Sequence, residues 1–321
     1  MTYFNTFTYG PANVDKILST TLSLYKKQFS DNIFTGVPVI KRLIKKNKKT
    51  YQGGASIIMP LMYAKNGNAK WYSRYDTLDL TPSEMMTSCQ AKWKQLAGVV
   101  SLSGLDIRVN QGKEALIKLL EAEIKNTELT LIDKLGSAIF AATQDALAIQ
   151  TLVTLVDATS SIADINSTTY SWWQSTATAS GAFAAQGLTD MRTLYNTLSK
   201  YNRSDTPDML VTTQTVFEYY ENKLDIIHRI VDTKNADLGF PEDAIQFKGA
   251  KMIWDENCNS GVMYFLNSNH IELVTHRDAD FSNGPFIPSI TQDAKVSHIL
   301  WQGELVTDER RKLGKLTGIT A

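Results

Sequence analysis

Cysteine is scarce in this chain, since Cys89 and Cys258 are the only two cysteines among its 321 residues. Two cysteines so far apart do not make a disulfide framework, and no CxxC pair offers a zinc site. The four histidines are scattered without HExxH or comparable spacing. Acidic residues at positions 255, 256, 278 and 280 match no calcium-loop spacing, so we interpret them as turn residues that flank strands. We therefore expect two unpaired thiols in a reducing compartment and no metal.

Catalytic signatures are missing as well. The sequence contains no GxGxxG, no GxxxxGK[ST] and no GxSxG, which leaves dinucleotide binding, P-loop chemistry and a hydrolase elbow without support. The absence of a motif does not exclude an enzyme, but it removes every positive reason for one. We predict no catalytic residues and no cofactor.

Excess charge of either sign is also lacking, because 33 lysines and arginines balance 33 aspartates and glutamates. Composition therefore favours neither nucleic acid nor an anionic membrane as a partner. No apolar run approaches the ~18 residues of a membrane helix, and the first residues have no signal-peptide pattern, so we expect synthesis in the cytosol. Near-zero net charge does little to hold copies apart, so self-association is tolerated.

What the chain does have is one long amphipathic segment, from Gln111 to Thr143. A straight helix of this length spans roughly 45 to 50 Å, well above the roughly 11 to 12 residues of an average helix. We expect Gly136 to bend or break it near its end. The segment predicts a spine along which other elements lie, with this apolar face: Leu116, Leu120, Ile124, Leu131, Leu135 and Ile139.

The residues before position 51 read as an arm with a short helix at Val14–Phe29. Pro38 restricts Val37 to extended geometry, so Val37–Val39 is predicted to be extended. A basic run follows, and it either faces a polyanion such as nucleic acid or an acidic patch, or forms a solvated connector. The run comprises Lys41, Arg42, Lys45, Lys46, Lys48 and Lys49.

The stretch from Tyr51 to Leu102 predicts a long hairpin. A strand at Ala55–Tyr63 contains Pro60, which argues for an edge or a bulge, and Asn66-Gly67 is a strong turn signal. Lys92–Leu102 reads as the returning strand. Such a hairpin is marginal alone in water, so its aromatic residues pack either on the same chain or on a second copy. Interfaces are rich in Trp, Tyr and Arg, and we predict a subunit interface at Trp71, Tyr72, Arg74, Tyr75 and Trp93.

The second half of the chain predicts a compact α/β subdomain. Residues 143–187 are rich in Ala, Ser and Thr, and within them Asp157–Ala185 reads as a long ordered loop or as short strands. A helix at about 189–201, a buried strand at 207–212 and a helix from Thr213 to about Leu224 follow. Four β-like runs are predicted at 244–247, 250–254, 262–267 and 271–275. We read one α+β protein in which roughly 186–295 is inserted before a returning strand at 295–305.

Several local stretches, in this order and spacing, are similar to those of tailed-bacteriophage major capsid proteins with the Hong Kong 97-type fold. They are Gly53-Gly54, Trp93-Lys94-Gln95, Asn110-Gln111-Gly112, Phe247-Lys248-Gly249, Trp254-Asp255, Met263–Asn267 and Trp301-Gln302-Gly303. The resemblance covers nearly the whole chain. It implies an N-terminal arm at 1–50, an extended E-loop hairpin at 51–104, a spine-helix peripheral domain at 105–185 and 296–321, and an α/β axial domain at 186–295.

The resemblance also implies a function. The chain is expected to self-assemble into hexamers and pentamers of an icosahedral shell, built in the host bacterial cytoplasm, that encloses double-stranded DNA contacted without base readout. Implied partners are many copies of the chain itself, portal and scaffolding proteins and a possible decoration protein, without a membrane. Scaffolding is expected to be a separate protein, and no Lys–Asn cross-linking pair stands out. Two alternatives stay open: a protein-cargo shell of the same fold, and a monomeric enzyme or ligand-binding domain with a hairpin lid.

Overall fold

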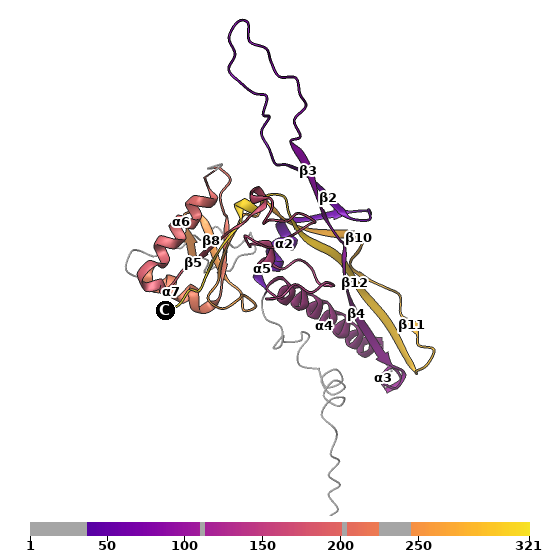
Figure 1. Cartoon of the computed structure of the whole chain (residues 1–321). Coiled ribbons are helices and arrows are strands. Elements are labelled where there is room, and N and C mark those ends of the chain that lie inside the picture. The colour runs from indigo at the N-terminus through magenta and orange to yellow at the C-terminus, as the bar shows by residue number, and fades with distance from the viewer. Residues whose placement is uncertain (1–36, 110–112, 201–203, 225–244) are drawn as a thin grey trace, which may run out of the picture. The chain divides into compact units, whose positions relative to one another are not determined.

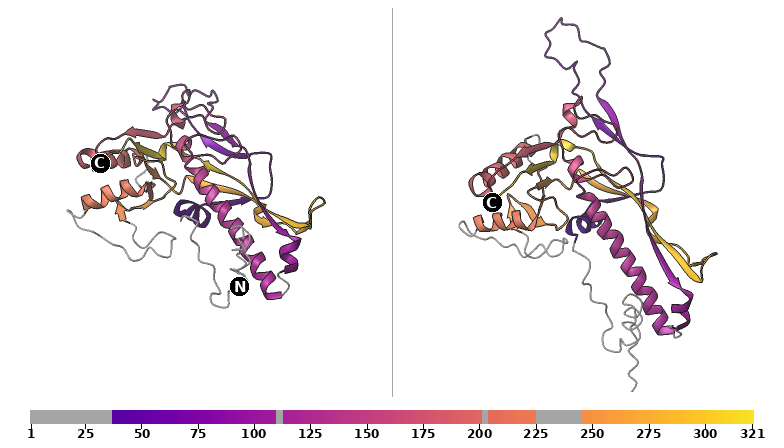
Figure 2. Two further views of the ribbon diagram at one scale, coloured as in Figure 1. Left: turned by 90° about the horizontal axis from the view of Figure 1, so that it is seen from below. Right: turned by 60° about the horizontal axis from the view of Figure 1, so that its bottom comes forward.

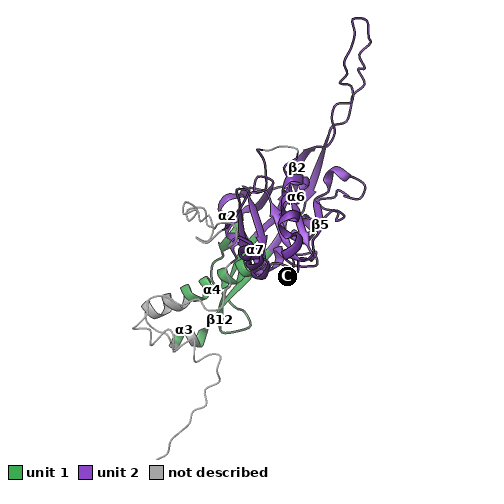
Figure 3. Cartoon of the chain, turned by 90° about the vertical axis from the view of Figure 1, so that its left-hand side faces the viewer, with its two compact units in different colours: residues 1–35, 96–133, 279–301 green, residues 36–95, 134–278, 302–321 purple. Residues whose placement is uncertain are grey.

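The computed structural model describes residues 37–109, 113–200, 204–224 and 245–321 (Figure 1). The predicted helix at Val14–Phe29 and most of the charged stretch near 223–239 lie outside these residues. The described chain forms two compact units (Figure 3). Unit 1 comprises Leu96–Asp133 and Ala279–Trp301, and unit 2 comprises Gly36–Gln95, Lys134–Asp278 and Gln302–Ala321. No helix among the described residues is both long and apolar enough to cross a membrane.

The spine prediction is confirmed as a single helix, α4, which runs from Lys113 to Ile139 over 27 residues. Leu131, Leu135 and Ile139 of the predicted apolar face are buried. The expected break at Gly136 is wrong, because the helix continues through it. A Cβ at this position would lie 2.5 Å from Val37 Cγ1, so the glycine allows close packing rather than ending the helix.

In unit 1, helix α4 packs against β-strands. Val100, Leu131 and Ile299 form its buried core, which alternating residues of β4 reach from one side of the strand. A Cβ at Gly98 would lie 2.5 Å from Thr127 Cγ2, so β4 and α4 approach closely here. The elements that contribute are β4 (Lys94–Ser103), α3 (Gly104–Val109), α4, β10 (Ile271–Asn283), β11 (Ile287–Pro288) and β12 (Ala294–Thr307).

The first sheet has five strands in the order β1-β10-β12-β11, with β4 pairing β12. Strand β1 (Lys48–Tyr51) runs parallel to β10, and β11 runs antiparallel to β12. The strands predicted at 271–275 and 295–305 are therefore confirmed, and both extend further than their sequence patterns indicated.

The second sheet, in unit 2, has six strands in the order β5-β13-β9-β6-β8-β7. Its bounds are β5 Thr176–Ala179, β13 Gly314–Thr317, β9 Met263–Leu266, β6 Met209–Thr212, β8 Ala250–Trp254 and β7 Ile245–Phe247. Helices α6 (Leu188–Leu198) and α7 (Gln214–Leu224) pack on the face that carries Leu210, Phe265 and Leu316 (Figure 2). The predicted helix–strand–helix pattern and the β runs that follow it are confirmed.

The segment 143–187, which contains the predicted loop, packs around the buried side chain of Arg310. The guanidinium of Arg310 donates hydrogen bonds to the backbone carbonyls of Thr154 (3.1 Å), Leu155 (3.0 Å), Asp157 (2.7 Å) and Ser160 (2.9 Å). Burial lowers the pKa of Arg310 to about 10. This segment contains three short helices: α5 (Leu152–Leu155), the 3-10 helix η1 (Ser171–Trp173) and the π-helix η2 (Phe183–Gly187). A side chain distant in sequence thus supplies the donors that a loop of this length needs.

The prediction of extended structure at Val37–Val39 is wrong, because helix α2 spans Pro38–Lys46. Proline restricts the residue before it but fits the first position of a helix, where its missing N–H would have no helical partner. The fully buried carboxylate of Asp255 then receives the backbone N–H of Val39. A residue more than two hundred positions away therefore caps this helix.

Candidate assembly surfaces

The long hairpin belongs to unit 2 and begins as two antiparallel strands, β2 (Ile57–Met62) and β3 (Met86–Ala91). Residues 63–85 connect them without further strand structure and extend away from the rest of the unit (Figure 1). The turn at Asn66-Gly67 is confirmed by a hydrogen bond from Ala69 N to Asn66 O. Pro60 lies in a two-stranded sheet, where every strand is an edge, as predicted.

The predicted returning strand at Lys92–Leu102 is wrong as the partner of the first strand. Residues 86–91 pair with β2, whereas β4 pairs with β12. Strand β3 reads Met-Thr-Ser-Cys-Gln-Ala and buries only Cys89, so its apolar alternation is too weak to stand out. The Val- and Leu-rich β4 gave the stronger local signal, although its partner lies far along the chain.

The lower part of the hairpin, which we call the hairpin root (residues 57–63 and 86–94), is held by other parts of unit 2. Gln90 N donates to Ala163 O at 3.2 Å. The ring of Tyr63 stacks on Trp172 with centroids 5.6 Å apart. Two further residues of the root, Leu61 and Cys89, pack with Ile165 and Trp173. The root is therefore fixed by contacts within the chain.

The remaining part, residues 64–85, is the hairpin tip, and its large side chains point into solvent. Trp71 is 102% exposed, Tyr75 91%, Leu80 89% and Tyr72 67%, and Arg74 is exposed as well. Polar bonds such as Ser73 N to Asp76 Oδ2 (2.7 Å) brace the backbone of the tip. Exposed apolar groups gathered on one loop mark an interaction surface more often than scattered ones do.

The structure separates Trp93 from the other predicted interface residues. Trp93 lies in the root, where its Nε1 donates to Gly54 O at 2.9 Å. Its ring meets His276 edge-on at 5.8 Å and packs beside Ile57 and Val306. Trp71, Tyr72, Arg74 and Tyr75 share the tip, whereas Trp93 is half-buried within its own chain. That any of these residues contacts another subunit stays a prediction.

The basic run divides into inward and outward side chains. Arg42 is buried, and its guanidinium lies 3.6 Å from Asp208, which Lys46 also approaches at 3.4 Å. Burial lowers the pKa of Arg42, although Asp208 opposes this shift. Lys49 pairs with Glu272, and Lys48 is half-buried.

Lys41 and Lys45, by contrast, are exposed and stand four residues apart on α2. Residues at this spacing share one side of a helix. These two lysines are therefore the members of the run best placed to meet a polyanion, and that role stays a prediction.

A second charged group, which the sequence did not reveal, surrounds His270. Its Nε2 lies 2.6 Å from Asp205 Oδ2 and its Nδ1 lies 2.8 Å from Asp308 Oδ1. Burial of the ring opposes protonation, but the bonds and charges of Asp308 and Asp205 outweigh it and raise the pKa of His270 to about 9. Lys312 Nζ donates to Asp205 O at 3.0 Å.

Among the described residues, Asp205, His270 and Glu309 are the one group of three side chains close enough to share a metal ion. The imidazolium of His270 and the ammonium of Lys312 already supply positive charge to Asp205. We therefore interpret the group as a structural network of ion pairs. It joins the residues before β6, the β9–β10 turn and the segment after β12, which are distant in sequence and gave no local signal.

Both thiols are unpaired, as the sequence predicted. Burial raises the pKa of Cys89 to about 11 and that of Cys258 to about 12. A thiol reacts as its thiolate, so both side chains behave as small apolar groups of the interior at neutral pH.

Comparison with known proteins finds likeness in structure but not in sequence. No protein-family model matches the chain, and no curated protein matches it in sequence. The capsid asymmetric unit of cyanophage A-1(L) matches with a TM-score of 0.64, covering 95% of this chain and 99% of that chain at 18% identity. The capsid of the native GTA particle matches with a TM-score of 0.62, over 92% and 96% of the two chains at 10% identity.

The holo-SrpI encapsulin complex from Synechococcus elongatus PCC 7942 also matches, with a TM-score of 0.59. The match covers 94% of this chain and 95% of that chain at 9% identity. At these identities the likeness concerns the fold. The chain therefore has the α+β, Hong Kong 97-type fold of phage capsid proteins, as the sequence motifs predicted. An encapsulin shares this fold as well.

Proposed function

We propose that this chain is the major capsid protein of a tailed double-stranded DNA phage. Copies of it join into hexamers and pentamers that close an icosahedral shell around the genome. The observation that carries the proposal is the hairpin tip, where Trp71, Tyr75 and Leu80 are almost fully exposed. No surface among the described residues covers this tip, and in a shell the surface of a neighbouring copy would do so.

The energetics of the tip favour a repeated protein contact. Burying one large apolar side chain contributes roughly 2 to 3 kcal/mol, so three such residues supply a useful part of a subunit contact. Exposed apolar area of this kind otherwise promotes uncontrolled association. The polar bonds that brace the tip reduce the ordering cost of docking, since part of its backbone geometry already exists.

The proposed regions follow the sequence resemblance. Residues 51–104 act as the E-loop, 105–185 and 296–321 as the peripheral domain, 186–295 as the axial domain and 1–50 as the arm. In support, 186–295 contains α6, α7 and four strands of the six-stranded sheet. Strands β5 and β13 join that sheet from outside this range.

DNA is proposed as a partner on the chemistry of the exposed lysines, and the protein partners are proposed from the family resemblance. Lys41 and Lys45 screen phosphate charge on packaged DNA without reading bases. Portal and scaffolding proteins, and in addition a decoration protein, complete the assembly in the bacterial cytoplasm. The chain acts structurally and carries no catalytic residue.

A protein-cargo shell is the second candidate, because the encapsulin complex shares the fold. The two shells differ in what they enclose. Nuclease-treated particles that still contain double-stranded DNA favour the phage capsid, and particles that contain only protein favour the cargo shell.

Sedimentation velocity over a concentration series, followed by negative-stain microscopy of any fast fraction, tests the proposal. Rings of five or six copies, or closed shells, support it. A species of about 35.8 kDa at every concentration, even with a crowding agent, contradicts it and favours a monomeric enzyme or binding domain with a hairpin lid.

A matched pair of variants locates the contact. Tyr75→Ala combined with Trp71→Ala is expected to shift sedimentation toward small species while the far-ultraviolet circular dichroism stays unchanged. Leu147→Ala, at a residue that is 80% exposed but lies outside the hairpin, is the control and is expected to assemble normally.

A further inference from the structure

Two asparagines of the sequence are followed by glycine: Asn66 in the hairpin tip and Asn283 at the end of β10. An asparagine before glycine is prone to lose its side-chain amide, because glycine has no Cβ to shield its backbone nitrogen from the neighbouring side chain. The sequence presents the two pairs alike, whereas the structure places them in opposite surroundings.

At Asn66, the groups that would react are open to one another and to solvent. Asn66 and Gly67 are both exposed, and among the described residues no group accepts a hydrogen bond from Gly67 N. A Cβ added at Gly67 would meet no atom within 4 Å. This nitrogen is therefore free to act as a nucleophile, and ammonia released from Asn66 passes directly into solvent.

The side-chain carbonyl of Asn66 is held and polarised by two donors. Its Oδ1 accepts hydrogen bonds from Asn68 N at 2.9 Å and from the hydroxyl of Ser83 at 3.2 Å. The first bond folds the side chain over its own backbone and so brings Cγ towards Gly67 N. Both donors point at the oxygen on which negative charge develops when a nucleophile adds to Cγ, as in an oxyanion hole.

At Asn283, the corresponding nitrogen is engaged. Gly284 N donates to His298 O at 2.9 Å, and Gly284 O accepts from the hydroxyl of Ser297 at 2.7 Å. A backbone nitrogen must leave such a bond before its proton can be removed, as in hydrogen exchange. The contact with β12 therefore protects Asn283.

We propose that Asn66 deamidates spontaneously, that Asn68 N and the Ser83 hydroxyl stabilise the reaction, and that Asn283 keeps its amide. Gly67 N loses its proton and forms a bond to Asn66 Cγ. The bond from Cγ to Nδ2 breaks, and this nitrogen leaves with the proton as ammonia. Water then opens the cyclic succinimide. Attack of water at Cγ gives aspartate, and attack at the backbone carbonyl carbon gives isoaspartate, in which the chain runs through Cγ.

Isoaspartate at this position loosens the tip. Ser83 is bonded to Asn66 across the tip. A second bond across it runs from Asn68 Nδ2 to Thr81 O. Running the backbone through Cγ displaces both anchor points and adds a negative charge. The chemistry belongs to the single chain, and only its consequence for assembly rests on the proposed function: the modification limits how long a free subunit stays competent to dock its tip.

Peptide mass spectrometry on the full-length chain tests the proposal. Unassembled protein is incubated in mildly alkaline buffer, and labelling by an isoaspartyl methyltransferase distinguishes isoaspartate from aspartate. The peptide with Asn66 is expected to convert many-fold faster than the peptide with Asn283. Its rate is expected to rise with pH, because the attacking nitrogen must lose its proton. In urea the two peptides are expected to convert at similar rates, since the fold no longer separates them.

Two variants test the mechanism. Gly67→Ala fits the open space at this position, but its methyl group shields the nitrogen, so conversion of Asn66 is expected to slow many-fold. Ser83→Ala removes one donor to Oδ1 and is expected to slow conversion several-fold. Ser88→Ala, at an exposed serine of β3, is the control and is expected to react as the wild type does.

Assembled particles separate this proposal from the proposed function. Conversion of Asn66 is expected to be slower in particles than in free subunits, because a neighbouring copy covers the tip. Equal rates in particles and subunits would contradict the covered tip and still support deamidation of Asn66.

Three results would overturn the deamidation site. The first is an Asn66 that keeps its amide in the folded chain, or converts no faster than Asn283, while both convert in urea. The second is an undiminished rate in Gly67→Ala, which would exclude attack by this nitrogen. The third is an unchanged rate in Ser83→Ala, which would remove the stabilising role of its hydroxyl.

Discussion

The root and the tip of the hairpin contain similar residue types, but these side chains are covered in the root and exposed in the tip. In the root, Leu61 and Trp93 find partners within the same chain, and Leu61 is 7% exposed. In the tip, Leu80 and Trp71 have almost their whole side chains in solvent. An aromatic or aliphatic residue in a hairpin therefore indicates that its side chain is covered in the assembled state. It does not indicate whether the same chain or another molecule covers it.

The largest expected effect concerns the support beneath the root. Arg310→Ala is expected to lower the free energy of unfolding by roughly 5 kcal/mol, because several buried carbonyls lose their donor at once. Its guanidinium also lies 5.9 Å from the ring of Trp173, which packs against the root. Urea denaturation measures the change. The neighbouring Arg311→Ala, at a far more exposed side chain, is expected to cost less than about 1 kcal/mol.

The difference between root and tip is tested most directly by replacing one leucine with alanine in each of them. Leu61→Ala is expected to cost roughly 3 to 4 kcal/mol of folding stability, since it leaves a cavity beside Cys89 and Trp173. Leu80→Ala is expected to cost less than about 0.5 kcal/mol, because the side chain is exposed. Urea denaturation of unassembled protein measures both. Equal losses would mean that the tip packs on its own chain.

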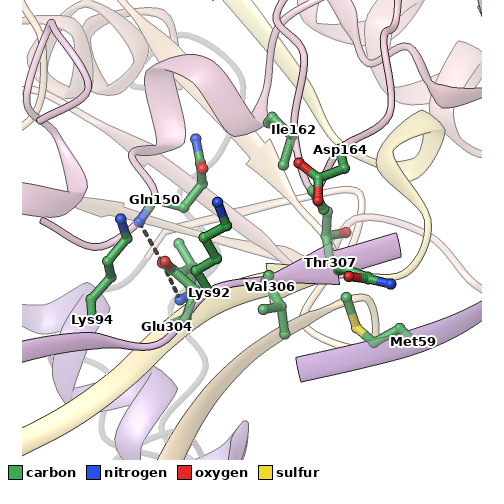
Figure 4. A pocket seen from close by; sticks show the side chains of 13 residues that line it. Met59, Lys92, Lys94, Gln150, Ile162, Asp164, Glu304, Val306 and Thr307 are labelled. Carbon is green, nitrogen blue, oxygen red and sulfur yellow. Dashed lines mark hydrogen bonds between the residues drawn. The ribbon is translucent and has the colours of Figure 1, made fainter. Parts of the chain in front are cut away.

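A third prediction concerns the buried carboxyl group of Glu304 on β12, which lines a pocket of about 190 Å³ beside the hairpin root (Figure 4). Burial raises the pKa of Glu304 to about 7 in the fold against 4.5 in the open chain, so its stabilising contribution is complete below about pH 4.5 and is lost as pH rises through 7. The unfolding free energy of the wild type minus that of Glu304→Gln is expected to fall by roughly 3 kcal/mol between about pH 4.5 and pH 8. Other titrating groups, including buried Asp255, cancel in this difference. Denaturation midpoints across this range check it.

The smallest expected effect tests whether Trp93 contributes to folding stability rather than to a subunit contact. Trp93→Phe keeps most of the ring packing on Ile57 and Val306 but removes the hydrogen bond to Gly54 O. We expect a loss of roughly 1 kcal/mol in folding stability and no change in sedimentation, in contrast with Trp71→Ala. An assembly defect without a stability loss would place Trp93 at a subunit contact as well.

The sequence by itself determined the elements whose signal is local. The apolar period of α4, the helix–strand–helix run from α6 to α7 and the turn at Asn66-Gly67 were predictable, because neighbouring residues along the chain set helix period, strand alternation and turn geometry. The motifs that resemble phage capsid proteins also pointed to the fold, which the structural matches confirm.

Tertiary structure decided everything that joins distant residues. Strand β3 is the partner of β2 despite its polar sequence, and Asp255 caps a helix that the sequence read as extended. Arg42 is drawn inward by Asp208, and Glu304 is buried beside Gln150. Burial and long-range pairing depend on which surfaces meet, and no window along the chain contains that information. The same physics leaves the hairpin tip open, because within the described chain no second surface covers it.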